Sequence, residues 1–205
     1  MNGPSAGVAG HEKQIACLFV DMRNSTALGE QKMPYDVIFI LNQFFIQLDA
    51  ALRDTNGYYA SFTGDGLMAI YGGDDDDLET ACRNALEGAA QIQRRLVKLN
   101  LWLAAELTSP LRVGIGIHCG VAIVGTMGPP DAPTISAIGD NVNIAARFEV
   151  LSKKFKTILV TSEEVLDRAG VQQDDLPRHT VNIRGREESI NIVVVDDPVK
   201  LTRNL

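Results

Sequence analysis

The stretch from Ala60 to Gly72 constrains the fold of this 205-residue chain most strongly, because it has the pattern of a β-hairpin. Glycines flank Asp65 on both sides, and glycine adopts turn conformations that other residues disfavour. Aromatic and apolar residues, which favour strands, fill Tyr58 to Phe62 and Leu67 to Tyr71. The sequence therefore predicts a strand, a tight turn with Asp65 at its tip, and a returning strand. An Asp-Gly pair is also ordinary turn chemistry, so the turn by itself assigns no function.

Apolar patterns on both sides of this hairpin predict the core of the fold. Ile15 to Val20 is a continuous apolar run ending at Asp21, as in a central strand buried on both faces. Apolar residues recur at helical spacing from Val37 to Leu52 and again from Leu78 to Leu99. They alternate from Leu111 to His118, which predicts another strand. The order β-α-β-β-α-β is that of an α+β, ferredoxin-like fold.

Further elements are expected after this core. His118 is interpreted as a hydrogen-bonded strand histidine, since no second ligand accompanies it. Gly114 and Gly116 leave room for a helix or a partner chain to pack closely. The expected extra strands and helices are a strand at 121–127, a rigid loop at 128–133, a helix from Gly139-Asp140, a strand at 157–161, a helix at 162–169 capped by Ser162, and a hairpin at 179–195 turning at 186–188.

Length and local composition indicate one domain. A chain of 205 residues fills one ordinary hydrophobic core and is too short for two. Residues 1–12 are small and polar without periodicity, so we expect a linker there and a folded domain over residues 13–205. The linker-like start also leads us to expect a regulatory domain upstream in the full-length protein.

Charge and hydropathy argue against two kinds of partner. The net charge is −7, and the 19 basic residues form no run, so we expect no binding to long nucleic acids. No apolar run approaches the roughly 18 residues that span a bilayer, so we expect no membrane contact by this domain. Cys17, Cys82 and Cys119 lie in apolar segments without metal-ligand spacing, which indicates buried thiols in a reducing compartment. We therefore expect a cytoplasmic domain, which a longer protein could tether to a membrane or a sensor.

Two carboxylates are expected to converge in this plan. The first strand and the first hairpin are neighbours in a ferredoxin-like sheet, which brings Asp21 and Asp65 together. Adjacent carboxylates repel unless a cation lies between them, and oxygen ligands of this kind suit Mg²⁺ or Mn²⁺. Paired aspartates are the basis of two-metal phosphoryl chemistry. The sequence therefore predicts a nucleoside triphosphate as substrate.

Polar residues elsewhere suit the other parts of such a substrate. If a helical turn begins at Asn24, Ser25 and Thr26, its free amides form an anion site, although an ordinary helix cap would look the same. Asn143 and Arg147 are four residues apart and share a helix face. An amide beside a guanidinium suits developing negative charge on a phosphate, whereas such a pair alone is often only a surface feature.

Four segments occur in one characteristic order. They are Leu18 to Met22 with Ser25 and Thr26, Phe62 to Gly66, Val113 to Gly120, and Ile138 to Arg147. On these segments the chain closely resembles the class III adenylate and guanylate cyclase catalytic domain, of the bacterial homodimeric type, over residues 14–195. The resemblance implies intramolecular attack of the ribose 3′-oxygen on the α-phosphate, with release of pyrophosphate.

The resemblance also implies roles for individual residues. Asp21 and Asp65, with the Met22 carbonyl as a third ligand, would bind two Mg²⁺ or Mn²⁺ ions, and Asn143 and Arg147 would stabilise the transition state.

In the family the nucleotide binds at a dimer interface, with the metals on one subunit and the transition-state residues on the other. Arg184 matches a basic position that reaches the terminal phosphates. The resemblance thus implies a homodimer with two equivalent sites.

The residues that read the base depart from the usual pattern. Ser61 stands where many adenylate cyclases carry lysine, and Ser136 replaces the common aspartate. Hydroxyl groups both donate and accept, so they do not distinguish adenine from guanine. The glutamate of many guanylate cyclases is absent, which favours ATP. Gly114 occupies a position where some relatives have a phosphate-binding arginine. The alternatives are a guanylate cyclase, or a catalytically silent module for dimerisation or nucleotide sensing.

Overall fold

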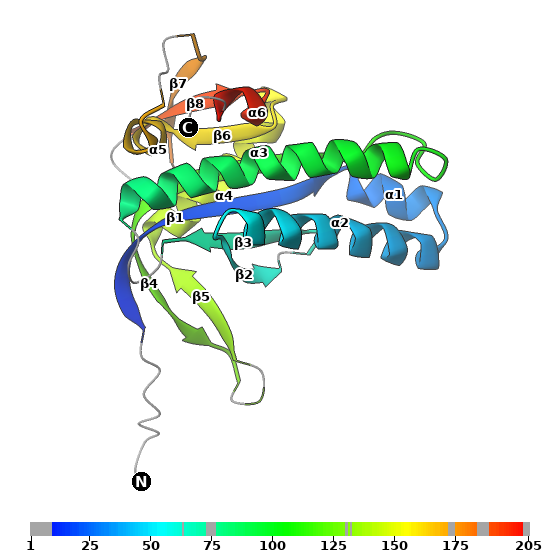
Figure 1. Ribbon diagram of the computed structural model, residues 1–205, viewed down its shortest axis with the longest axis horizontal. Helices are drawn as coiled ribbons and strands as arrows, with labels where there is room; N and C mark the ends of the chain where they lie inside the picture. The colour runs from blue at the N-terminus through cyan, green and yellow to red at the C-terminus, as the bar shows by residue number, and fades with distance from the viewer. Residues whose placement is uncertain are drawn as a thin grey trace.

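A computed structural model describes residues 10–62, 64–72, 77–129, 131, 133–171, 175–183 and 189–202 (Figure 1). The described chain contains both strands and helices. In order they are β1 (His11–Arg23), α1 (Ser25–Gln31), α2 (Pro34–Asp54), β2 (Tyr58–Phe62), β3 (Gly66–Tyr71), α3 (Leu78–Trp102), β4 (Arg112–Met127), β5 (Thr134–Ile138), α4 (Asp140–Phe155), β6 (Leu159–Ser162), α5 (Glu163–Ala169), β7 (Arg178–Asn182), β8 (Ser189–Val195) and α6 (Pro198–Leu201).

One mixed sheet forms the centre of the protein, in the order β2-β3-β1-β4-β6-β8-β7, and β5 pairs with β4 outside this path. Strand β1 is antiparallel to both β3 and β4, and β2 is antiparallel to β3. The strand order β4-β1-β3-β2 with intervening helices is the predicted ferredoxin-like core. The expected α+β class is thus confirmed, with β6, β7 and β8 as the C-terminal extension.

Helices cover both faces of this sheet. Figure 1 shows α2 and α3 side by side across one face, while α4 lies behind β1 and β4. Along β1, Ala16, Leu18 and Val20 point into the larger core with α2 and α3, whereas Ile15 and Cys17 point toward α4. This two-sided burial is the reason why the strand reads as a continuous apolar run. All three cysteines are buried free thiols, as predicted.

Helix α2 is the one described helix whose length and composition would allow it to cross a membrane. Its buried residues Ile40, Phe44, Leu48 and Leu52 follow helical spacing and pack into the main core. A core helix of a globular domain has the same length and composition.

Gly116 on β4 allows helix α4 to pack closely against the sheet. A Cβ atom on Gly116 would lie 2.2 Å from the Glu149 nitrogen and 2.3 Å from the Ala145 oxygen. Those atoms belong to the backbone of α4, so the close approach predicted at Gly116 is made by a helix of the same chain.

Several predicted boundaries are wrong. Strand β1 begins at His11, before the expected Lys13, because its polar first residues pair with the projecting half of β4: His11 lies opposite Val124. The two strands expected over 111–127 are one long strand, and Gly120 bends it with φ of 146°.

Two short elements were not predicted. Strand β5 alternates only weakly and depends on pairing with β4, and helix α6 is four residues long.

Ser162 caps α5 differently from the prediction. It is the N-cap residue, but its side chain makes no capping hydrogen bond. Its hydroxyl lies 2.8 Å from His118 Nδ1 instead, which confirms His118 as a hydrogen-bonded strand histidine. The predicted turn at 186–188 lies outside the described residues.

Candidate functional site

Asp21 and Asp65 meet where β1 passes the β2–β3 hairpin. The Cα of Asp21 lies opposite that of Gly66 in β3, and the Met22 N–H donates to the Asp65 carbonyl over 3.4 Å. A Cβ on Gly66 would lie 2.2 Å from the Val20 oxygen and 2.7 Å from the Asp21 Oδ1. The glycine therefore allows the close approach of the two strands. The predicted convergence of the two aspartates is confirmed.

The hairpin tip has the conformation that its glycines favour. Gly64 has φ of 80°, in the left-handed region, and nothing lies within 4 Å of a Cβ built on it. Asp65 follows directly and is half-buried. Thr63, between β2 and Gly64, lies outside the described residues.

Burial and a neighbouring carboxylate change the titration of Asp21. Burial, then the Asp65 carboxylate and then Glu149 raise the pKa of Asp21 to about 7, against a smaller opposing effect from Arg23. Two carboxyl groups that share one site cannot both ionise at their ordinary pKa values. The site therefore favours a bound proton or a bound cation between the two side chains.

A pocket of about 390 Å³ opens over the two aspartates. The predicted residues Asp21, Met22, Asp65, Asn24, Ser25 and Thr26 all line it, together with Arg23, Ala27, Glu30 and Lys153. Helix α1 begins at Ser25, so the helical turn on which the anion site depends is present, and the side chain of Asn24 makes no capping hydrogen bond. The first backbone amides of α1 are therefore next to the carboxylates.

The donor set of this pocket fits a hard divalent cation. Two carboxylates and a backbone carbonyl at Met22 offer only oxygen ligands, which Mg²⁺ and Mn²⁺ prefer. Within the described residues, no group of three or more His, Cys, Asp and Glu side chains gathers to hold a metal. A substrate phosphate and water would therefore complete the coordination, as is usual for Mg²⁺.

Sequence reasoning missed an ion pair beside the aspartates. Arg23 Nη1 lies 2.8 Å from Glu149 Oε1, and Arg23 Nη2 donates to the Glu149 carbonyl over 2.9 Å and to the Ser152 hydroxyl. Burial raises the pKa of Glu149, and Arg23 opposes that rise. A Cβ on Gly114 would overlap the Arg23 guanidinium, at 1.5 Å from Nη2. The alternation of side chains along a strand could have predicted that Arg23 lies near the aspartates, since it places Arg23 on the same face of β1 as Asp21.

Other predicted residues lie outside this pocket. Asn143 and Arg147 are exposed on one face of α4, and neither lines the aspartate pocket. Ser61 lies in β2, next to a register shift. Ser136 lies in β5, where it pairs with Gly125 of β4. Strands β2 and β5 contact each other, so the two serines lie on neighbouring elements. Arg184 is outside the described residues.

Solved structures share the whole architecture. The crystal structure of the guanylyl cyclase Cya2 is 25% identical, with a TM-score of 0.81, and the match covers 91% of this chain and 93% of that one. The crystal structure of the adenylyl cyclase CyaB from P. aeruginosa is 22% identical, with a TM-score of 0.79, covering 92% and 96%. The second likeness concerns the fold alone.

Curated relatives are longer proteins. An adenylate cyclase of Anabaena cylindrica is 29% identical over 194 residues, which are 91% of this chain and 38% of that protein. Adenylate cyclase 1 of Rhizobium meliloti is 27% identical over 197 residues, covering 95% and 29%. The family profile described as the adenylate and guanylate cyclase catalytic domain matches residues 8–196. With its paired aspartates, its fold and this match, the chain belongs to the adenylate and guanylate cyclase catalytic domain family.

Proposed function

We propose that this domain converts ATP to 3′,5′-cyclic AMP and pyrophosphate. The observation that carries the proposal is the convergence of Asp21 and Asp65 beside the first turn of α1 in one pocket. In the reaction, a bond forms between the ribose 3′-oxygen and the α-phosphorus, and the bond from the α-phosphorus to the bridging oxygen of the β-phosphate breaks. The 3′-hydroxyl loses its proton, and pyrophosphate leaves.

Two divalent ions, Mg²⁺ or Mn²⁺, would be held by Asp21, Asp65 and the Met22 carbonyl. When bound, they supply charge neutralisation at the triphosphate and acidify the attacking hydroxyl. The amides at Asn24, Ser25 and Thr26 orient the phosphates through hydrogen bonds. Arg184 is proposed to contact the terminal phosphates.

The site is completed by a second copy of the chain in this proposal. Asn143 and Arg147 are exposed on α4, so a partner subunit can present them to the aspartate pocket without unfolding either copy. A closed, isologous dimer would form two identical sites in this way. Asn143 then positions the ribose, and Arg147 stabilises the negative charge that develops on the α-phosphate.

Base selection rests on Ser61 and Ser136 in this proposal. Their hydroxyl groups accept or donate as needed, so they are compatible with either purine. The names of the Anabaena and Rhizobium relatives favour ATP, whereas the name of Cya2 favours GTP. We propose ATP as the main substrate, with guanylate cyclase activity as the second candidate.

The testing experiment measures cyclic AMP and cyclic GMP formed from ATP and GTP side by side with Mn²⁺. Asp65→Ala serves as the inactive control, and Asp36→Ala on the exposed start of α2 is a matched surface control. Cyclic AMP as the main product supports the proposal. Cyclic GMP as the main product overturns the choice of substrate, and no cyclic product from either nucleotide indicates a silent module.

The cellular context is part of the same proposal. The relatives extend well beyond the matched domain, and a regulatory domain elsewhere in a longer protein would control dimer geometry. The three buried thiols and the nucleotide substrate support a cytoplasmic location.

A further inference from the structure

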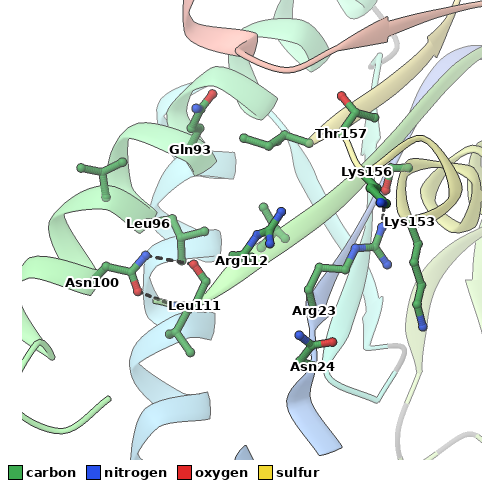
Figure 2. Close-up of a pocket in the computed structure, with 14 residues that line it drawn as sticks. Arg23, Asn24, Gln93, Leu96, Asn100, Leu111, Arg112, Lys153, Lys156 and Thr157 are labelled. Atoms are coloured by element: carbon green, nitrogen blue, oxygen red, sulfur yellow. Dashed lines mark hydrogen bonds between the residues drawn. The ribbon is translucent and has the colours of Figure 1, made fainter. Parts of the chain in front are cut away.

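A second pocket lies beside the aspartate pocket, at the same end of the sheet. It has a volume of about 420 Å³ and is bounded by α3, the start of β4 and the end of α4. Figure 2 shows Arg112 in its middle, with Leu96 and Asn100 on one side and Arg23, Lys153 and Lys156 on the other. Arg23, Asn24 and Lys153 line both pockets, so the two are adjacent.

This pocket carries concentrated positive charge. Arg23, Arg112, Lys153 and Lys156 line it, and no acidic residue does so in the described part of the chain. Glu149 neutralises Arg23 and interacts with Lys153. Arg112 and Lys156 form no ion pair with any described residue. Their charges are therefore available to a ligand.

The walls contain two buried polar groups without a hydrogen-bond partner among the described residues. The hydroxyl of Thr157 is buried without a hydrogen bond to any described group, and the residue is only 7% exposed. Gln93 Oε1, on the α3 side of the same pocket, is also buried and has no hydrogen-bond partner within the described part of the chain. Because an unsatisfied buried polar group destabilises the protein, a ligand that supplies a hydrogen-bond partner binds more tightly here.

Two hydrogen bonds hold the pocket wall between α3 and the start of β4 in place. Asn100 Nδ2 donates to the Leu111 carbonyl over 2.9 Å, and the Leu111 N–H donates to Asn100 Oδ1 over 2.7 Å (Figure 2). These two bonds fix Leu111, the residue directly before β4, against α3. The position of the Arg112 backbone is therefore set before any ligand arrives, which lowers the ordering cost of binding.

The helix dipole of α4 accounts for only some of the basic residues that line this pocket. Lysines in the last turn of α4 complement the negative end of its dipole, so Lys153 needs no ligand to account for it. Arg112 belongs to a strand, and its charge has no such role. Thr157 lies beyond the helix, where its buried hydroxyl is unrelated to the dipole.

We propose that this pocket binds a phosphate-type anion at a site separate from the substrate triphosphate. Arg112 and Lys156 would neutralise it, and the Thr157 hydroxyl would donate to one of its oxygens. Two sources share this chemistry: inorganic phosphate from solution, and pyrophosphate leaving the adjacent aspartate pocket. Only the second source rests on the proposed cyclase function.

The test uses calorimetric titration of the whole domain with inorganic pyrophosphate and, separately, with inorganic phosphate. The protein carries Asp21→Asn and Asp65→Asn, and the buffer contains EDTA, so the metal site does not contribute. Arg112→Gln combined with Lys156→Asn removes both free charges. Asparagine is chosen because Lys156 has φ of 56°, which asparagine tolerates. Lys154→Gln, on the same helix but outside the pocket, is the matched control.

Saturable binding that weakens about tenfold or more in the double charge variant, and not in Lys154→Gln, supports the site. A tenfold loss corresponds to about 1.4 kcal/mol, which is the scale of one charge-assisted hydrogen bond. Thr157→Val should weaken binding by a smaller factor while circular dichroism shows an unchanged fold. Preference for pyrophosphate identifies the product as the source, and equal affinity identifies solution phosphate. Equal binding to all variants, or no binding at millimolar anion, overturns the proposal. Cyclase activity is measured separately, so failure of the proposed function leaves this result interpretable.

Discussion

Asp21 and Asp65 meet where β1 pairs with the start of β3, and the Met22 N–H donates to the Asp65 carbonyl over 3.4 Å. The backbone bond holds the two carboxyl groups together although their charges repel. The pKa of Asp21 rises to about 7 as a result of burial and of this neighbour. The protein thus keeps an electrostatically unfavourable pair that a divalent cation would relieve.

Replacement of Asp21 should separate stability from activity. In Asp21→Asn the repulsion is gone, so we expect the melting temperature of the metal-free protein at pH 8 to rise by about 2–4 °C. This corresponds to about 1 kcal/mol after allowance for the solvent exposure of the site. Cyclase activity should fall by about 100-fold or more, because a proposed metal ligand is lost. Differential scanning fluorimetry measures the melting temperature, and a cyclic nucleotide assay measures the activity. A lower melting temperature would contradict this account.

The stability of the metal-free protein should decrease as the pH rises from about 4 to about 7. The folded protein holds a proton on Asp21 up to pH about 7, whereas the unfolded chain releases it near its ordinary pKa of about 3.9. The folded state therefore binds more protons in this window, and its relative stability falls with pH.

Urea titrations at several pH values in EDTA measure this slope. Asp21→Asn should flatten it, and saturating Mn²⁺ should reverse it, since the cation replaces the proton. An unchanged slope in Asp21→Asn would show that other groups produce it.

Inactive variants should complement each other if the site spans two subunits. Asp65→Ala and Arg147→Ala should each be inactive, and Arg147→Ala should keep the native melting temperature because the side chain is exposed. In an equal mixture, half of the dimers are mixed and each has one intact site, so about a quarter of the original activity should return. Co-refolding followed by an activity assay measures this, and no recovery would argue against a shared site.

Small changes at glycines should have opposite effects on stability. Gly116→Ala should destabilise the fold by about 3 kcal/mol, since its Cβ would overlap the backbone of α4 near Glu149 and Ala145. Gly29→Ala is the matched control, because it lies within α1 with nothing within 4 Å of the added atom. It should stabilise the protein by up to about 1 kcal/mol through helix propensity. Denaturant unfolding compares both, and equal effects would contradict the packing argument.

Local patterns predicted most of the central fold. The β-hairpin around Asp65 and the apolar run before Asp21 were recognisable because strand periodicity and turn chemistry act over a few residues. Strand β5 and the polar beginning of β1 were not predicted, because both form by pairing with the C-terminal half of β4. Such pairing depends on residues more than a hundred positions away for β1, which no local window contains.

The sequence by itself determined which residues meet in the aspartate pocket, because Asp21, Asp65 and the start of α1 require only a ferredoxin-like strand order to converge. Tertiary structure decided what surrounds that pair. The bare surface at Gly114 leaves room for the Arg23 guanidinium beside Glu149, and the meeting of three elements gathers Arg112 and Lys156 into a second, cationic pocket. The physical reason is that charge and volume at a point in space sum over all nearby side chains, whereas a sequence motif records only those that are neighbours along the chain.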